Sequence, residues 1–360
     1  MILFITRKYP PSVGGMQKYC YELANTLGAR SETKIISWGR SQAFLPWFFL
    51  QAFMQSAFCL LTRPIEIIHV GDALLSPLGW MLKKIFRKPV SATLHGLDVT
   101  FDFRPYQWGI PWFLRRLDKL ICVSEHTRQE AIQRGVPPGK SVVIPNGILV
   151  LNDKRHGAEK NNGALIENLI GQNLAGKKIL LTVGRLVERK GVDYFVAQIL
   201  TKIFPHRDDV VYLVIGEGKH RTAIEKTIAN LKLEEKVFLL GRVDDAALHA
   251  AYQMAHVFVM PNVPVTGDME GFGLVALEAT LAGLPVVASK LEGICEAISH
   301  GKNGILIDHP NPEAFARAIL DFLHDETKRR DFGGRSRDFT VQKYSWEKIG
   351  NEYMNILVNL

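Results

Sequence analysis

The sequence GDMEGFGLVALEATLAG, residues 267–283, joins a strand pattern to a helix pattern through a glycine-containing turn. The residues before it, 256–260 (HVFVM), are apolar and predict a buried strand, whereas Leu274 to Leu281 places apolar side chains at helical intervals. The helix is therefore expected to begin near Gly273. Of the two carboxylates in this stretch, Glu270 lies in the loop before the helix and Glu278 lies inside it.

This turn has the features of a phosphate-binding site. Glycines let a backbone approach a ligand closely, and the free N–H groups of a helix N-terminus attract anions. The donors expected here are the backbone N–H groups of Phe272, Gly273, Leu274 and Val275. Glu270 would then reach the group attached to the phosphate, and Glu278 would accept hydrogen bonds from a ribose diol. These features indicate a nucleotide-sugar, although two solvated glutamates beside an ordinary helix would be the better interpretation of such a pair alone.

A second stretch, GRLVERKG at residues 184–191, supplies cations after another expected strand. Arg185 can hold phosphate oxygens through two parallel hydrogen bonds, and Lys190 offers a compact positive charge, so the two together suit a diphosphate. A solvated basic loop would explain this stretch if it stood alone. Combined with the two glutamates at another strand end of the same sheet, it favours diphosphate binding.

The first half of the chain shows the alternation of a doubly wound α/β domain. Strands are expected at residues 2–6, 33–37, 65–70, 90–95, 120–123 and 142–145, with helix-length segments between most of them. Crossovers of this length indicate a parallel sheet, in which ligands bind at the carboxyl ends of the strands.

Two of these strand ends carry candidate site residues. Gly14 and Gly15 follow the first strand and form a second candidate phosphate-binding turn. This turn lacks the three spaced glycines of a dinucleotide fingerprint, so a nicotinamide cofactor is not expected. His95 opens the sequence HGLD at another strand end. A lone histidine is as often structural as catalytic, but its position beside Gly96 favours a functional role.

The second half repeats this architecture after a change in composition. Residues 151–177 are mostly polar and contain several glycines, which predicts a linker with a short helix at 164–170. Strands are then expected at residues 179–183, 210–215, 237–240, 256–260, 285–288 and 305–307, and helices at 312–323, 326–339 and 346–357. The last helix keeps an apolar stripe formed by Trp346, Ile349, Tyr353, Ile356 and Leu357.

Length and composition agree with two globular domains and an anionic partner. The chain has 360 residues, 47% of them hydrophobic, and a net charge of +8. Such a charge suits nucleic acid, an acidic membrane surface or a phosphorylated substrate. The four cysteines are scattered, which argues against a disulfide framework or a zinc site and for a reducing cytoplasm.

The most apolar stretch is AFLPWFFLQAFMQSAFCLL, residues 43–61. Pro46, Gln51, Gln55 and Ser56 interrupt it, so a membrane span is not expected, but a buried helix and a helix at a bilayer interface both remain open. Residues 80–88 and 103–116 mix aromatic and cationic side chains, as interfacial elements do. No nucleic-acid motif accompanies them, and no nucleic acid partner is expected.

At this point the motifs resemble a known family. PPSVGGMQ, HGLD, VSEHT, IPNGI, GRLVERKG, EGFGLVALE and YSWEKI are similar to family 4 of the retaining, nucleotide-sugar-dependent glycosyltransferases, nearly from end to end. Within this family, the motifs are most similar to those of phosphatidylinositol-mannoside mannosyltransferases and of lipopolysaccharide and exopolysaccharide glycosyltransferases. That subgroup carries a glutamate where this chain has Asp98.

The resemblance implies a GT-B fold, in which two Rossmann-like domains face a cleft and the C-terminal helix crosses back to the first. The acceptor-side domain would be residues 1–150 with 345–360, and the nucleotide-sugar domain residues 178–344. In the family, residues matching Arg185 and Lys190 contact the donor diphosphate, as does the backbone at Gly14 and Gly15.

The other implied roles divide between donor and acceptor. The match to Glu278 binds the ribose, the match to Glu270 holds sugar hydroxyls, and residues around Val243 meet the base. His95 matches a histidine near the transferred sugar. Gln17 and Asp98 are the acceptor-side candidates.

The expected function is transfer of a hexose from a UDP- or GDP-sugar to a glycan or lipid-linked acceptor. The chain has no Asp-x-Asp, so no metal and no further cofactor are expected, and Arg185, Lys190 and the two glycine turns would neutralise the diphosphate. Front-face attack is favoured, with His95 orienting the sugar. The alternatives are a GT-B-type sugar-nucleotide epimerase and a non-catalytic sugar-nucleotide-binding module. The expected location is the cytoplasm, with docking to the inner face of the cytoplasmic membrane as a second hypothesis.

Overall fold

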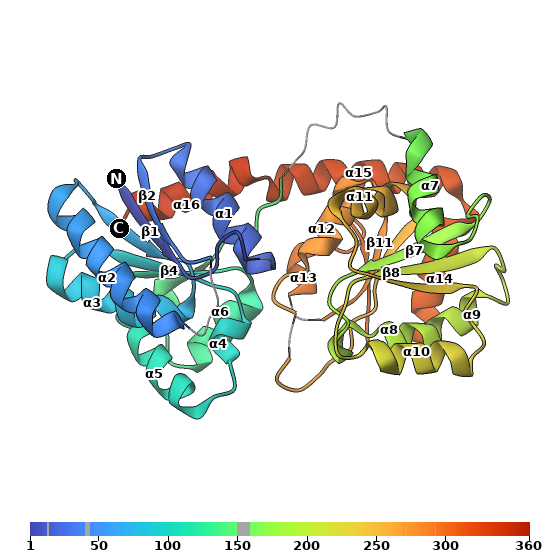
Figure 1. The fold of residues 1–360 in the computed structure, drawn as a ribbon, viewed down its shortest axis with the longest axis horizontal. Helices are drawn as coiled ribbons and strands as arrows, with labels where there is room; N and C mark the ends of the chain where they lie inside the picture. Colours follow the sequence, from blue (N-terminus) through green and yellow to red (C-terminus); the bar gives the residue numbers. More distant parts are fainter. Residues whose placement is uncertain (13, 40–43, 150–158, 269, 292) are drawn as a thin grey trace. The chain divides into compact units, whose positions relative to one another are not determined.

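The structure is a computed structural model that describes residues 1–360 except 13, 40–43, 150–158, 269 and 292. Residue 43, the first of the apolar stretch, and residues 151–158, the first part of the expected linker, therefore lie outside the described residues. The chain forms two compact units, each described by itself below (Figure 1). Unit 1 comprises Met1–Leu149 with Tyr344–Leu360, and unit 2 comprises Val150–Lys343.

Unit 1 is built on a parallel sheet in the order β2-β1-β3-β4-β5-β6. A sheet covered by helices on both faces needs apolar side chains on both, and the four central strands are almost entirely buried, whereas the edge strands β2 and β6 are mostly half-buried. Each strand lies within two residues of its expected position. The bounds are β1 (Ile2–Thr6), β2 (Thr33–Ser37), β3 (Ile67–Val70), β4 (Val90–Leu94), β5 (Lys119–Cys122) and β6 (Ser141–Val143).

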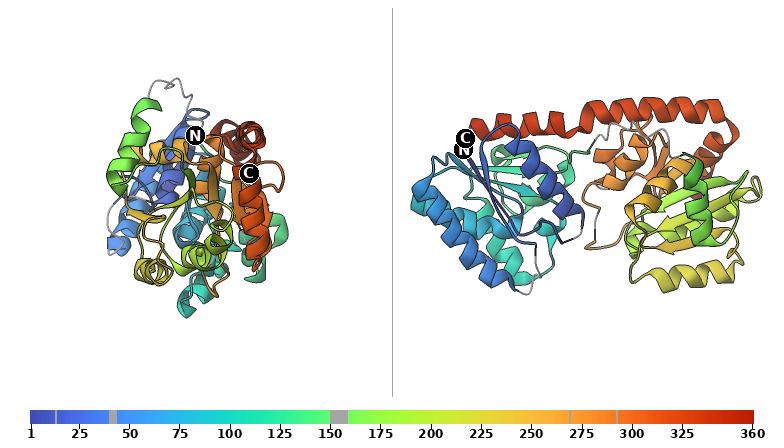
Figure 2. Two further views of the ribbon diagram at one scale, coloured as in Figure 1. Left: turned by 90° about the vertical axis from the view of Figure 1, so that its right-hand side faces the viewer. Right: turned by 45° about the horizontal axis from the view of Figure 1, so that its top comes forward.

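The helices of unit 1 form two layers. α1 (Gly15–Gly28) packs with α16 (Trp346–Val358) over one face of the sheet, and Figures 1 and 2 show the two side by side. The other face carries α2 (Leu45–Thr62), α3 (Ser76–Phe86) and α5 (Arg104–Leu114), with α3 between α2 and α5. Shorter segments are η2 (Ala73–Leu75), α4 (Leu97–Thr100), α6 (Glu125–Gln133) and η3 (Pro138–Lys140).

The terminal helix completes the core of unit 1. Ile349, Tyr353 and Leu357, four residues apart, are buried against α1, as the stripe in the sequence predicted. The Tyr353 hydroxyl shares a short hydrogen bond with the hydroxyl of Tyr19. A Cβ at Gly350 would overlap the Thr26 side chain, so the absence of a side chain there lets α16 and α1 approach closely.

Unit 2 contains a second parallel sheet in the order β12-β11-β10-β7-β8-β9. Counted along the chain from β7, this is the doubly wound order 3-2-1-4-5-6 read from the β9 edge. The bounds are β7 (Lys178–Val183), β8 (Val210–Ile215), β9 (Val237–Gly241), β10 (Val257–Met260), β11 (Val286–Ser289) and β12 (Ile305–Ile307). These six strands also lie within two residues of their expected positions.

The helical segments of unit 2 surround this sheet. They are α7 (Glu159–Ile170), η4 (Glu188–Lys190), α8 (Val192–Tyr194), η5 (Phe195–Leu200), α9 (Thr201–Ile203), α10 (Arg221–Asn230), α11 (Asp245–Met254), α12 (Leu274–Leu281), α13 (Ile294–Ala297), α14 (Pro312–His324) and α15 (Glu326–Tyr344). α7 lies where a linker with a short helix was expected. It is longer and packs against α11, because Ile166 gives it a buried apolar anchor. α15 is five residues longer than expected, ending at Tyr344 rather than at 339.

Removing apolar volume from α16 should destabilise unit 1. Ile349→Ala deletes a fully buried side chain, so the free energy of unfolding measured with urea should fall by about 2–5 kcal/mol. The control is Val358→Ala on the exposed end of the same helix, expected within about 0.5 kcal/mol of wild type. Equal effects of the two substitutions would show that α16 is not packed as described.

Candidate active site

The candidate site residues of unit 2 follow from the position where its strand order reverses. β7 pairs with both β8 and β10, so chain segments leave its carboxyl end beside that of β10 although the two strands are far apart in sequence. In doubly wound sheets this reversal point is where ligands bind. The loop after β7 contains Arg185 to Lys190, and the loop after β10 contains Asn262 to Glu270.

These two loops are joined by a buried ionic cluster around Glu270. Lys190 Nζ lies 2.6 Å from Glu270 Oε2, and Arg189 Nη1 contacts the same oxygen. Arg189 also holds Asp268, with 2.8 Å between Nε and Oδ1. Asn262 Nδ2 donates a further hydrogen bond to Glu270 Oε2 at 3.3 Å. One carboxylate oxygen therefore gathers three donors from two loops.

Burial and charge act in opposite directions on this carboxylate. Burial alone would raise the pKa of Glu270, but Lys190, and then Arg189, lower it to about 2. Burial would lower the pKa of Arg189, whose side chain is only 5% exposed, yet Glu270 and Asp268 raise it. Glu270 and Arg189 are thus both held in their charged forms. Removing one partner of such a buried pair leaves an uncompensated charge.

A glycine allows the two loops to meet. Gly191 adopts φ 62°, a left-handed conformation that favours glycine, and a Cβ there would overlap the carbonyl oxygen of Pro261. The close backbone approach places Lys190 and Arg189, which precede Gly191 in the turn η4, against the loop after β10.

The glycine turn at the start of α12 lies directly after Glu270. Gly273, at φ 84°, caps the helix, Phe272 before it is buried, and Leu274 and Val275 form the first helical turn. This is the strand-to-helix turn expected from the sequence. Glu278 lies one turn further on, half-buried, where its Oε2 accepts a hydrogen bond from the Tyr252 hydroxyl at 3.2 Å.

The side chains of two further predicted residues of unit 2 form no hydrogen bond or ion pair with this cluster. Arg185 follows β7 and is exposed, and its side chain makes no hydrogen bond or ion pair with the residues that the structure describes. Val243 follows β9 and is half-buried next to Asp244, the cap of α11.

The candidate residues of unit 1 lie at the corresponding edge of its own sheet. Here β1 pairs with both β2 and β3, and Arg7 after β1 forms an ion pair of 2.9 Å with the buried Asp72 after β3. Gly14, at φ 156°, precedes the first turn of α1, in which Gly15 is exposed and Gln17 is half-buried.

His95 is fixed by contacts from three sides. Its Nε2 lies 3.0 Å from the carbonyl oxygen of Gly71, and the ring packs edge-on against Tyr19. Asp98 accepts hydrogen bonds from the backbone N–H groups of His95 and Ala73, at 2.7 and 3.0 Å. Asp98 is buried, and burial raises the pKa of its carboxyl group. These contacts give Asp98 a role in holding the His95 turn.

A buried polar network connects the neighbourhood of His95 to the terminal helix. His69 bonds to the hydroxyls of Ser91 and Thr93 at 2.8 and 3.0 Å, and Thr93 bonds to Tyr353 at 2.9 Å. Tyr353 in turn contacts Tyr19, which packs on His95. Burial lowers the pKa of His69 to about 3, so its imidazole is neutral near pH 7.

The structure thus brings together Lys190 and Glu270, as the sequence suggested, but adds a partner that the sequence analysis did not select. Arg189, rather than Arg185, is the arginine bound to Glu270. Asn262 and Tyr252 were also missed. Asn262 could have been found as a polar residue two positions after a strand, whereas nothing in the sequence links Tyr252 to Glu278. Among the residues described, no group of three or more His, Cys, Asp or Glu side chains is placed to hold a metal ion.

Comparison with solved structures identifies the fold. The chain matches the crystal structure of Anabaena HepE in complex with UDP at a TM-score of 0.77 and 19% identity, with both chains covered completely. The two parallel sheets with their helices are therefore those of a GT-B glycosyltransferase, which confirms the fold expected from the motifs.

Comparison of sequences gives the family. Residues 13–149 match the family described as Glycosyltransferase Family 4, and residues 167–339 match Glycosyl transferases group 1. N-acetyl-alpha-D-glucosaminyl L-malate synthase of Bacillus anthracis is 30% identical over 81% of this chain and 74% of its own. The GDP-mannose-dependent alpha-(1-6)-phosphatidylinositol monomannoside mannosyltransferase of Mycobacterium tuberculosis is 25% identical over 99% of this chain and 97% of its own. The chain therefore belongs to the group 1, family 4 glycosyltransferases.

The ionic cluster predicts a pH dependence of stability. Because the folded state lowers the Glu270 pKa from 4.5 to about 2, the carboxylate stabilises the fold above about pH 4.5, and this contribution is lost as the pH falls towards 2. Its size is about 3 kcal/mol. Glu270→Gln should destabilise the protein by about 3–5 kcal/mol at pH 7, measured by urea unfolding, and by progressively less below pH 4.5.

The matched control is Glu234→Gln, which removes an exposed carboxylate from the same unit. This variant should follow the wild-type dependence on pH. A constant difference between Glu270→Gln and wild type from pH 7 to pH 3 would contradict the assignment of the lowered pKa to Glu270.

Proposed function

We propose that this protein is a retaining, metal-independent hexosyltransferase that uses a UDP- or GDP-sugar and transfers the hexose to a glycan or lipid-linked acceptor. The observation that carries this proposal is the cluster of Arg189, Lys190 and Glu270 at the strand reversal point, directly before the glycine-capped start of α12. It places Lys190 and the Glu270 carboxylate next to the helix start that would bind the diphosphate and the sugar hydroxyls. The relatives named above, one of them GDP-mannose-dependent, support a nucleotide-sugar donor.

The donor roles are assigned to unit 2. Arg185 and Lys190 neutralise the diphosphate together with the N–H groups of the α12 turn, from Phe272 to Val275. Glu278, oriented by Tyr252, accepts hydrogen bonds from the ribose, and residues around Val243 meet the base. Glu270 accepts hydrogen bonds from the sugar hydroxyls, as a carboxylate acceptor.

The low pKa of Glu270 bears on the mechanism. A carboxylate with a pKa of about 2 binds a proton weakly near pH 7, so Glu270 is a poor general base for the acceptor hydroxyl. In the proposed front-face reaction the bond from C1 of the sugar to the phosphate oxygen breaks, and the acceptor oxygen bonds to C1 on the same face. The acceptor proton passes to the departing phosphate, and the nucleoside diphosphate leaves.

Unit 1 is assigned to the acceptor side. His95, held by Gly71 and Tyr19, orients the transferred sugar, and the backbone at Gly14 and Gly15 adds N–H groups for the diphosphate. Gln17 contacts the acceptor, and Asp98 acts there through the His95 turn that it holds. A lipid-linked acceptor would place the protein in the cytoplasm, peripherally on the inner face of the cytoplasmic membrane, with an anionic membrane surface as a partner.

The donor is identified by screening UDP- and GDP-sugars by thermal shift, because a ligand at 100 times its Kd stabilises the folded state by about 2.7 kcal/mol. Transfer from the stabilising donor is then measured in the presence of EDTA, and the anomeric configuration of the product by NMR. Retained configuration with undiminished transfer supports the proposal. An inverted product, or a donor converted to an isomer without any acceptor, would contradict it.

Arg185 is the cleanest test of diphosphate binding, because its side chain is exposed and forms no hydrogen bond or ion pair with the described residues. Arg185→Ala should lower the transfer rate by about 100-fold or more while leaving the melting temperature of the free protein unchanged. Arg317→Ala, at another exposed arginine of unit 2, should leave both unchanged. Near-normal transfer by Arg185→Ala would remove this residue from the site.

His95→Ala tests the role assigned to unit 1. The variant should keep the thermal shift given by the nucleoside diphosphate, because the diphosphate contacts lie elsewhere, while kcat falls by about 100-fold or more. Tyr106→Phe, which removes only a hydroxyl bonded to the Asp98 carbonyl, is the neighbouring control for effects on the fold of this region. A loss of kcat as large in Tyr106→Phe would point to a structural cause.

A further inference from the structure

The outer face of unit 1 carries a row of exposed apolar side chains on α2, here called the apolar ridge. Its members are spaced three and four residues apart, on one side of the helix, and each is between 54% and 77% exposed. They are Trp47, Leu50, Met54, Phe58 and Leu61. The opposite side of α2, with Phe48, Ala52, Ser56 and Cys59, is buried in the core.

This ridge is unusual for a surface in contact only with water. Soluble monomers seldom expose contiguous apolar patches beyond a few hundred Å², and larger ones mark sites of interaction. α2 is long and apolar enough to cross a membrane by length and composition, and its sequence has no charged residue. One side of it packs into the core of unit 1, however, so crossing would expose Phe48 and its neighbours. The helix can meet an apolar phase only with the ridge, lying along the surface.

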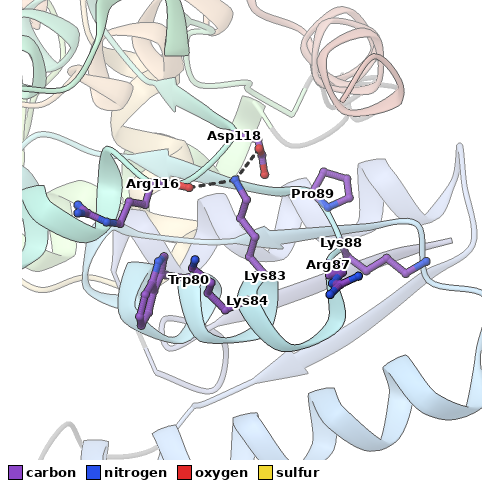
Figure 3. Close-up of a pocket in the computed structure, with 8 residues that line it drawn as sticks. All are labelled: Trp80, Lys83, Lys84, Arg87, Lys88, Pro89, Arg116 and Asp118. Atoms are coloured by element: carbon purple, nitrogen blue, oxygen red, sulfur yellow. Dashed lines mark hydrogen bonds and ion pairs between the residues drawn. The ribbon is translucent and has the colours of Figure 1, made fainter.

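A basic pocket lies beside α3, the next helix of the same layer. It has a volume of about 790 Å³ and is lined by Trp80, Lys83, Lys84, Arg87, Lys88, Pro89, Arg116 and Asp118 (Figure 3). Lys83 is turned towards Asp118 and the Arg116 carbonyl, at 2.6 and 3.0 Å. Lys84, Arg87 and Lys88 form no ion pair with any residue that the structure describes. The pocket therefore holds cations in excess of its single carboxylate.

The ridge and the basic pocket belong to one helix layer. α3 packs against α2 on one side and α5 on the other, and Figure 1 shows α2 and α3 side by side. The sequences of α2, α3 and α5 contain no Asp or Glu. Aromatic rings belong to the same layer: Trp80 lines the pocket, the Arg116 guanidinium lies 3.4 Å from the ring centre of Trp112, and Trp108 on α5 is exposed. Apolar and aromatic side chains beside cations are the composition of a membrane-interface element.

We propose that this layer docks on an anionic lipid bilayer, with the apolar ridge in the boundary between headgroups and acyl chains and the basic pocket around a lipid phosphate. Charge decides between this and other occupants. A second copy of the chain packed symmetrically on this face would bring two uncompensated basic pockets towards each other, whereas lipid phosphates neutralise them. A soluble phosphate compound would fill the pocket but leave the ridge in water.

The docking deepens the proposed function, since it brings the protein to the surface where a lipid-linked acceptor resides. It does not depend on the transfer reaction. Donor-induced thermal shift with UDP or GDP and binding to vesicles are measured separately, so that either can fail while the other succeeds.

The experiment is flotation of the full-length protein with vesicles of phosphatidylcholine alone or mixed with phosphatidylglycerol. Binding is expected only to the mixed vesicles. Binding should weaken as salt rises from about 0.1 M to about 1 M, which shortens the Debye length from about 10 Å to about 3 Å. Each cation near an anionic surface contributes roughly fivefold in affinity, so Lys84→Gln with Lys88→Gln should weaken binding by about 25-fold.

The ridge is tested by Phe58→Ser with Leu61→Ser, which should weaken binding to the mixed vesicles by more than about tenfold. The matched controls are Lys226→Gln with Arg317→Gln for charge and Leu169→Ser with Val358→Ser for apolar area, all at exposed positions outside this layer. Both control pairs should bind like wild type. Circular dichroism and melting temperature establish that every variant is folded.

Four outcomes would overturn the proposal. One is equal binding to neutral and anionic vesicles, and another is loss of binding in the control pairs. Light scattering that shows a dimer converted to a monomer by Phe58→Ser with Leu61→Ser would assign the ridge to a second copy. Binding that inorganic phosphate abolishes and the ridge substitutions leave unchanged would reduce the site to a soluble phosphate pocket.

Discussion

The geometry of unit 2 depends on one carboxylate oxygen that two cations share. Glu270 Oε2 draws Arg189 and Lys190 from the loop after β7 onto the loop after β10, and their charges offset the cost of taking all three groups out of water. Gly191 makes the approach possible because no side chain separates it from the Pro261 carbonyl. Three charged groups thus fix the loop directly before the glycine turn that opens α12.

In unit 1, buried side chains are held together by hydrogen bonds between neutral groups instead of by ion pairs. A chain of hydrogen bonds runs from Ser91 through His69 and Thr93 to Tyr353 on the last helix. Since burial keeps His69 neutral, the chain can satisfy its donors and acceptors without a counter-ion. Tyr19, which is hydrogen-bonded to Tyr353, packs against the ring of His95 and restricts its position.

The sequence predicts the strands well and the neighbours of its charged residues poorly, for separate reasons. Strands of a parallel sheet are buried on both faces, so each is a short apolar run that can be read directly. The lengths of the crossovers indicate a parallel sheet, but they do not indicate the order of its strands. This order is what brings Lys190 to Glu270. Arg185 and Arg189 differ only in position within one loop, and the turn η4, which buries Arg189 and leaves Arg185 exposed, has no periodic signal. Ile166, a buried residue of α7, which packs against α11, lies in a segment whose polar composition suggested a linker.

Because α16 packs on α1 but follows it by several hundred residues, the two helices are synthesised at different times. The ribosome releases α1 well before α16, and the 317 residues from 29 to 345 emerge between them. At about 5–20 residues per second this interval lasts roughly 15–65 s. During that time the side of α1 that carries Tyr19 and Thr26, which face Tyr353 and Gly350 in the folded protein, has no covering helix.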